Sequence, residues 1–349
     1  MSVRSIARML GLSTAAAFVM AASMVRAAAP APVEHGDRFS VPDTVSPEAK
    51  AGLDALYGLL AAPPPPSDIA AIVAKRSSDL IAKLRVTLTD DRIGGVKILR
   101  IRPAATRATG WTLVYLHGGG YVGGSTRAMI GLPALIAART GSEVISIDYT
   151  LAPHADWRTI TGEVVTVWRG LLAAGADPHA SAIFGDSAGG SLTAGATLRL
   201  RDEGVPLPAA LYLVSPWADI SARGDTYGTL SASDPILALS TLAAAANAYA
   251  RPEDRRHPYV SPVYGDYAKG FPPTLIQCGT REMFVSNCVR EYQAIRGGGH
   301  EAVLDLYEGM PHAFPGYVPY APETDQAVAR AADFLAAHLR SSPGMTISR

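Results

Sequence analysis

The apolar positions of this 349-residue chain alternate between two patterns from about residue 85 onward. Short apolar runs of the kind that form strands recur at 86–89, 96–101, 112–116, 144–147, 181–184, 209–214, 274–278 and 302–307. Apolar residues at helical spacing predict helices between them at 128–139, 164–172, 191–201 and 323–339. Strands alternating with helices predict an α/β fold, with a mostly parallel sheet flanked by helices on both faces.

Two regions depart from this alternation. Ser46 precedes a helical pattern rich in leucine, and a second helical pattern covers 69–81, so we expect an appendage of two helices before the first strand. Residues 216–267 are rich in Pro, Asp and Ser around one alanine-rich helix near 239–249. This segment is expected to be an insert into the sheet domain.

The first residues have the order of a secretory signal. Arg4 and Arg8 precede an apolar, alanine-rich stretch at 9–25, and residues 25–27 fit a small-residue cleavage site. We therefore expect export to the periplasm or the exterior, with an uncleaved membrane anchor as the alternative. The expected divisions are a signal peptide (1–27), a flexible leader (28–45), N-terminal helices (46–84), a main domain (85–340) with the insert at about 216–267, and a disordered tail (341–349).

Composition narrows the possible partners. Hydrophobic residues make up 48% and charged residues 18%, as in a globular protein, and the net charge of zero gives no support for nucleic-acid binding. The two cysteines, Cys278 and Cys288, would permit a disulfide in an oxidising compartment. Two buried free thiols are favoured, because Cys278 ends a strand that is expected to be buried.

A nucleophilic serine is predicted at Ser187. The sequence Gly185-Asp186-Ser187-Ala188-Gly189 is a Gly-x-Ser-x-Gly turn that follows one apolar run and precedes a helix. Glycines are needed on both sides of such a serine because side chains there would collide with the strand and the helix. The pattern alone is modest evidence, since a tight strand–helix turn can have the same sequence.

A base and an acid for this serine are found after the last two strands. His312 follows the run at 302–307, and Glu282 follows the run at 274–278, the edge of a parallel sheet at which site residues collect. The order of serine, acid and histidine along the chain is the one expected for this turn. Asp266 and Asp305 are weaker candidates for the acid, since one precedes its strand and the other lies within it.

A glycine loop supplies the N–H donors that ester hydrolysis by a serine also requires. His117 and the three glycines Gly118, Gly119 and Gly120 directly follow the strand at 112–116. Their backbone N–H groups, with that of Ala188, are predicted to stabilise an oxyanion, while His117 is expected to support the loop.

With these residues assembled, the chain resembles the hormone-sensitive-lipase-like branch of the α/β-hydrolases, the bacterial carboxylesterases. The resemblance covers about three-quarters of the chain and rests on segments 117–121, 148–153, 185–190, 215–219, 234–235, 260–262 and 309–314. It implies an eight-stranded sheet, a triad of Ser187, Glu282 and His312, and a cap made of the N-terminal helices and the insert. The family acid is usually Asp, so Glu282 is a departure, and Thr150, His154 and Ser191 also differ from the family pattern.

The resemblance implies a serine carboxylesterase that acts on small-molecule esters with short- to medium-chain acyl groups. Lactones, acetylated compounds and longer lipids stay open, as does a homodimer. No residue pattern calls for a metal or an organic cofactor, and no stable membrane span is expected once the signal is cleaved.

Two other classes of function are compatible with parts of the sequence. Gly118-x-Gly120-x-x-Gly123 matches a dinucleotide fingerprint that an oxidoreductase would use, although that fingerprint should open its helix immediately and here residues 121–126 intervene. A non-catalytic binding protein on a hydrolase fold is the other alternative.

Overall fold

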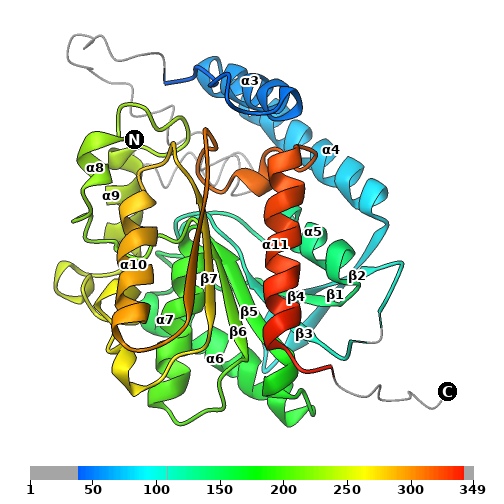
Figure 1. Ribbon diagram of the computed structural model, residues 1–349, viewed down its shortest axis with the longest axis vertical. Coiled ribbons are helices and arrows are strands. Elements are labelled where there is room, and N and C mark those ends of the chain that lie inside the picture. The colour runs from blue at the N-terminus through cyan, green and yellow to red at the C-terminus, as the bar shows by residue number, and fades with distance from the viewer. Residues whose placement is uncertain (1–37, 108, 342–349) are drawn as a thin grey trace.

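The computed structural model describes residues 38–107 and 109–341, so the predicted signal peptide and nearly all of the predicted tail lie outside the described residues. Its centre is an eight-stranded sheet in the order β1-β2-β4-β3-β5-β6-β7-β8 (Figure 1). The strands are β1 (Val86–Ile93), β2 (Val96–Pro103), β3 (Thr112–Leu116), β4 (Val144–Ile147), β5 (Ser181–Asp186), β6 (Ala210–Val214), β7 (Thr274–Gly279) and β8 (Ala302–Tyr307). β2 pairs antiparallel with both β1 and β4, and all other neighbours are parallel. The predicted α/β fold is confirmed.

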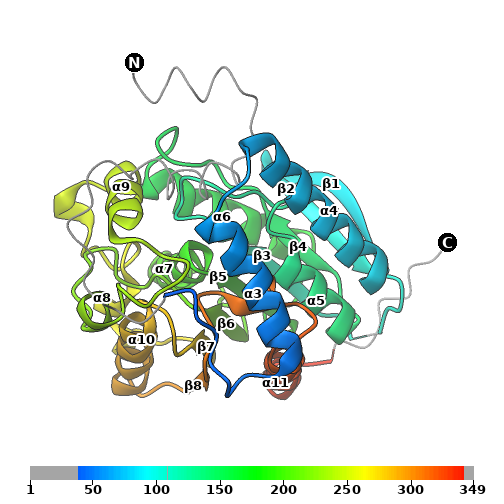
Figure 2. The same ribbon diagram turned by 90° about the horizontal axis from the view of Figure 1, so that it is seen from above.

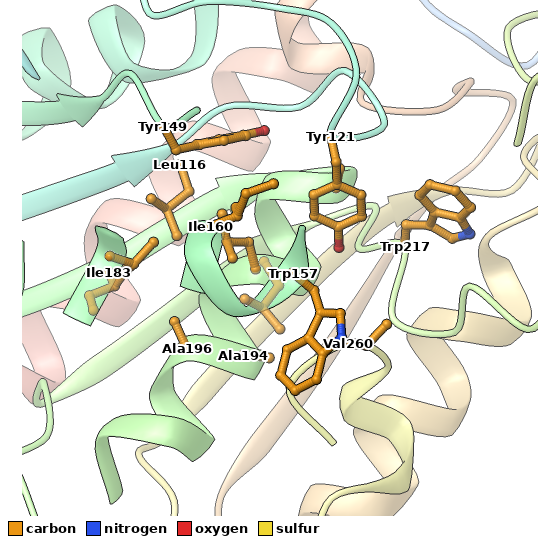
Figure 3. Close-up of a cluster of buried hydrophobic side chains, with 14 of the residues drawn as sticks. Leu116, Tyr121, Tyr149, Trp157, Ile160, Ile183, Ala194, Ala196, Trp217 and Val260 are labelled. Atoms are coloured by element: carbon orange, nitrogen blue, oxygen red, sulfur yellow. The ribbon is translucent and has the colours of Figure 1, made fainter. Parts of the chain in front are cut away.

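Helices cover both faces of this sheet, as the alternation predicts (Figure 1). One face packs against α6 (Trp157–Ala173), α7 (Ala188–Asp202) and α10 (Val285–Gly297), and the other against α5 (Gly131–Thr140) and α11 (Pro322–His338). Figure 3 shows part of the first core, in which Trp157 of α6 lies near Val260 and near Ala194 of α7. Burial on both faces explains why β3 to β7 carry a single charged residue, Asp186.

Two helices lie over the carboxyl ends of the strands (Figure 2). They are α3 (Pro47–Ala61) and α4 (Pro66–Leu84), and the N–H of Ala49 donates to the Ser46 hydroxyl at 3.1 Å, which caps α3 as predicted. The insert contains α8 (Thr226–Thr229) and α9 (Leu239–Tyr249). Within 38–107 and 109–341, no helix is both long enough and apolar enough to cross a bilayer.

Several predicted boundaries differ from the structure. Helix α6 begins at Trp157 rather than at 164, and α10 has no counterpart among the predicted helices. β1 continues to Ile93, because its backbone pairs antiparallel with β2 along its whole length, as far as Ile93 opposite Val96. Helix α5 begins at Gly131 rather than at 128, after a turn. Residues 38–45, predicted as part of a flexible leader, are packed, since Phe39 contacts Tyr57 at 5.9 Å between ring centroids and Val45 is buried.

Candidate active site

Ser187 lies at the tight turn between β5 and α7. Its φ of 55° and ψ of −122° are strained for a residue with a side chain, and its N–H donates to the Val214 carbonyl at 2.8 Å. A Cβ on Gly185 would lie 2.5 Å from the Gly189 carbonyl oxygen, and one on Gly189 would overlap the Leu116 carbonyl of β3. The two glycines are therefore required by close backbone contacts, as the sequence predicts.

The predicted base and acid contact each other. His312 follows β8, Glu282 follows β7, and 2.6 Å separates His312 Nδ1 from Glu282 Oε2. Both side chains are buried, at 3% and 0% exposure. Burial alone would lower the pKa of His312, but the adjacent Glu282 carboxylate outweighs it and raises the pKa above its ordinary value. The pair therefore stabilises a positive charge on the imidazole.

Ser187 and His312 lie on the wall of the same cavity. It has a volume of about 460 Å³ and extends from the carboxyl end of β5 to the underside of α3 and α4. The start of α5 and the segment 315–321 complete the wall. Most of its lining is apolar and includes Leu56, Leu59, Ile69, Ile72, Val73 and Val318. The structure thus places the predicted nucleophile and base beside a space suited to an apolar ligand.

The N–H groups of the glycine loop differ in whether another protein group already binds them. In the described chain, the N–H groups of Gly119, Gly120 and Ala188 donate no hydrogen bond to another protein group. The N–H of Gly118 instead donates to the carboxylate of buried Asp186 at 3.1 Å. Gly118 is therefore not a free donor, which corrects the prediction for this residue.

His117 is placed to support the loop. Its Nδ1 donates to the Gly118 carbonyl at 2.7 Å, and its ring stacks on Tyr149 at 4.2 Å between centroids. The Tyr149 hydroxyl in turn donates to the His117 carbonyl at 2.7 Å. Burial lowers the pKa of His117, which favours the neutral ring.

The weaker acid candidates have other partners. Asp266 is exposed, caps Ala268 and pairs with Lys269 at 3.3 Å. Asp305 accepts hydrogen bonds from Gln277 and Tyr307, at 3.0 and 2.8 Å. Of the three acid candidates, Glu282 alone contacts His312.

Two buried side chains that the sequence did not assign to the site hold the Glu282 loop. The Ser215 hydroxyl donates to Glu282 Oε1 at 2.6 Å, and Asp234 Oδ2 accepts the N–H of Met283 at 2.8 Å. Burial raises the pKa of Asp234 to about 6. Both residues belong to segments that carry the family resemblance, but nothing in the sequence indicates which atoms they contact.

Cys278 and Cys288 are free and buried, as favoured from the sequence. Among the residues that the structure places, no three His, Cys, Asp or Glu side chains are grouped so that they could hold a metal ion. The glycines of the dinucleotide-like pattern do not open a helix, since α5 begins only at Gly131.

Comparisons with known proteins agree with this architecture. A family model described as alpha/beta hydrolase fold matches residues 113–316. LipR of Mycobacterium tuberculosis, named provisionally as an acetyl-hydrolase, is 38% identical over 253 residues, which cover 72% of this chain and 81% of that protein. The acetyl-hydrolase of Streptomyces hygroscopicus is 35% identical over 235 residues, covering 67% and 78%.

Solved structures point to the same branch. The crystal structure of an esterase from the bacterial hormone-sensitive lipase family superposes with a TM-score of 0.77 at 32% identity, covering 84% of this chain and 99% of that one. An esterase/lipase from an uncultured bacterium superposes with a TM-score of 0.73 at 28% identity, covering 84% and 99%. The chain therefore belongs to the α/β-hydrolase family, in its hormone-sensitive-lipase-like branch, and is a carboxylesterase-type hydrolase.

Proposed function

We propose that this protein hydrolyses carboxylic esters with short- to medium-chain acyl groups through an acyl-enzyme formed on Ser187. The main support is the 2.6 Å contact between Glu282 and His312, with His312 and Ser187 on the wall of one apolar cavity. A carboxylate only accepts hydrogen bonds, so the proton of the imidazole lies on Nδ1 and Nε2 is free to act as a base.

The reaction proceeds in two halves. His312 Nε2 takes the proton of the Ser187 hydroxyl as Oγ attacks the ester carbonyl carbon, and the same proton then passes to the departing alcohol oxygen. A water molecule, deprotonated by His312, attacks the acyl carbon, and the imidazolium returns that proton to Ser187 Oγ as the bond to the acyl group breaks, which releases the carboxylic acid and regenerates the free serine. In both halves the N–H groups of Gly119, Gly120 and Ala188 stabilise the tetrahedral oxyanion.

The cavity favours apolar substrates. Its volume of about 460 Å³ lies in the range of small-molecule sites, and most of its wall is apolar, with polar side chains such as Glu48, Arg76 and Asp79 as exceptions. Esters with an apolar acyl chain therefore fit better than acetylated sugars. Two of the similar proteins, LipR and the Streptomyces hygroscopicus protein, are named as acetyl-hydrolases, the former provisionally, which supports activity on the shortest acyl esters as well.

Substitution of the nucleophile tests the reaction. Ser187→Ala is expected to lower kcat for p-nitrophenyl butyrate by at least about 10³-fold, while circular dichroism shows an unchanged fold. A correctly folded Ser187→Ala protein with near-normal kcat would contradict the proposal.

A rate series over p-nitrophenyl esters from acetate to palmitate, with a lactone for comparison, tests the substrate class. We expect the highest kcat/KM for short and medium chains. Leu56→Trp, which fills part of the cavity, should lower kcat/KM for the longer chains more than for acetate. Leu239→Trp is the matched control, because Leu239 is 46% exposed on α9 and does not line the cavity. A maximum at palmitate or at the lactone, or equal effects of the two variants, would contradict the proposed class.

A further inference from the structure

Ser215 occupies a strained position at the end of β6. It is the first residue after the strand, its side chain is fully buried, and its φ is 46°. Its N–H donates to the Gln277 carbonyl of β7 at 2.7 Å. A serine with positive φ is uncommon, and glycine is the residue that ordinarily occupies such a conformation. A side chain in this conformation costs backbone strain.

The Ser215 hydroxyl joins the loops that carry the acid and the base. It lies 2.6 Å from Glu282 Oε1, and the N–H of Ala313, directly after His312, donates to it at 3.0 Å. The Glu282 carboxylate has no proton to give, so the hydroxyl donates to Glu282 and accepts from Ala313. The direction of both hydrogen bonds is therefore fixed.

The two oxygens of Glu282 are held separately. Oε1 accepts from the Ser215 hydroxyl and from the N–H of Gly279 at 3.0 Å, whereas Oε2 contacts His312 Nδ1 at 2.6 Å. A glutamate has one more rotatable bond than an aspartate, so more freedom must be removed to keep Oε2 on the imidazole. The two donors on Oε1 restrict rotation of the carboxylate about that bond.

We propose that Ser215 is a positioning residue for ester hydrolysis, which acts through Glu282 by fixing the carboxylate against His312 and by tying the Glu282 loop to the His312 loop. Ser215 itself touches no reacting atom. The inference rests on the proposed roles of Ser187, Glu282 and His312.

A double-mutant cycle tests this inference in the full-length protein, with p-nitrophenyl butyrate as substrate. The hydrogen bond from Ser215 to the charged Glu282 should stabilise the transition state. Its loss in Ser215→Ala should therefore lower kcat by about 10- to 100-fold, with KM little changed. In the Glu282→Gln background, measured at high enzyme concentration, the same substitution should lower kcat by less than about 3-fold, because the carboxylate that it orients is gone. Equal effects of Ser215→Ala in the two backgrounds would overturn the inference.

The pH profile gives an independent readout. His312 must be unprotonated to act as a base, so kcat/KM falls as the pH drops through the pKa of His312. The Glu282 carboxylate raises this pKa against the effect of burial. A less firmly held carboxylate should therefore move the acid limb of the Ser215→Ala profile to lower pH. An unchanged acid limb together with an unchanged kcat would refute the positioning role.

A glycine variant separates the positioning role of the Ser215 hydroxyl from its effect on stability. Ser215→Gly relieves the strain of the positive φ but also lacks the hydroxyl, so it should be more stable than Ser215→Ala and no more active. Full activity of Ser215→Gly would mean that the backbone conformation alone matters, which contradicts the inference.

Ser261→Ala is the matched control. Ser261 is a buried serine that also accepts one backbone N–H at 3.0 Å and donates one hydrogen bond at 2.6 Å, but its partners are Ile220 and Arg255. It should lower the melting temperature without changing kcat or the acid limb. A loss of kcat as large as that of Ser215→Ala would show that general destabilisation explains both and would overturn the inference.

Failure of the inference can be told from failure of the proposed function. If Ser187→Ala and Glu282→Gln are strongly impaired while Ser215→Ala has normal kcat and a normal pH profile, the triad stands and the role of Ser215 is refuted. If a folded Ser187→Ala protein remains active, the proposed function itself fails.

Discussion

Shortening Glu282, the proposed acid of the triad, by one methylene tests how closely the site is matched to glutamate. In Glu282→Asp the carboxylate is drawn back by about one C–C bond, roughly 1.5 Å. The contacts to His312 Nδ1 and to the Ser215 hydroxyl are both 2.6 Å. Extended to about 4 Å, either contact would exceed hydrogen-bonding distance, so the shorter acid cannot keep both without movement of its loop.

The expected loss of kcat/KM follows from the hydrogen bonds that Glu282→Asp would break. A hydrogen bond to a charged group contributes about 1.5–3 kcal/mol, and 1.36 kcal/mol corresponds to a factor of ten in rate. Loss of one such bond in the transition state should lower kcat/KM by about 10- to 150-fold. Glu282→Gln keeps the length but removes the charge and disturbs the imidazole tautomer, so it should be more severe, by up to about 10⁴-fold.

Initial rates of p-nitrophenyl butyrate hydrolysis measure this effect, and thermal unfolding checks that each variant is folded. The order expected for kcat/KM is wild type, then Glu282→Asp, then Glu282→Gln. Wild-type activity in Glu282→Asp would show that the site is not matched to the longer acid. Activity of Glu282→Gln close to wild type would remove Glu282 from the proposed triad.

Three further predictions concern the framework around the site. Burial raises the pKa of Glu291 to about 8. The stability that its neutral form contributes is therefore complete below about pH 4.5 and is lost as the pH rises through 8. The melting temperature should fall more steeply between pH 5 and pH 9 for the wild type than for Glu291→Gln, and an equal fall in both proteins would contradict this. Gly189→Ala places a Cβ against the Leu116 and His117 carbonyls and should lower the free energy of unfolding by about 1–3 kcal/mol in urea titrations, whereas exposed Gly58→Ala, with open space around its Cβ, should not lower it. Cys278 and Cys288 are fully buried, so Ellman's reagent should modify them only on unfolding; rapid modification of the native protein would show that this region opens.

The sequence predicted the sheet and the placement of the triad candidates for a physical reason. The inner strands are buried on both faces, so they are continuous apolar runs, and the residues that follow them collect at one edge. Ser187 directly follows β5 and Glu282 comes shortly after β7, both inner strands, whereas His312 comes after β8, an edge strand on which Val303 and Leu306 are exposed. Their positions could therefore be inferred without knowledge of any side-chain contact.

The remaining features depend on contacts between distant segments. The N–H of Gly118 is taken by Asp186, which comes 68 residues later in the chain, and no local pattern reveals this pairing. The contact of Ser215 with Glu282 spans 67 residues in the same way. Residues 38–45 looked like a leader because of their composition, whereas the site of their packing, on α3, is set by the tertiary fold.

The central claim is that the Ser187 oxygen forms the covalent intermediate. The most direct measurement is intact-protein and peptide mass spectrometry after treatment with a p-nitrophenyl dialkyl phosphate, which leaves a stable phosphoryl group on an activated serine. We predict one phosphoryl group for each chain, located on the peptide that contains Ser187, with loss of esterase activity in proportion to labelling. Complete inactivation with the label on another residue, or full labelling with activity retained, would contradict the account.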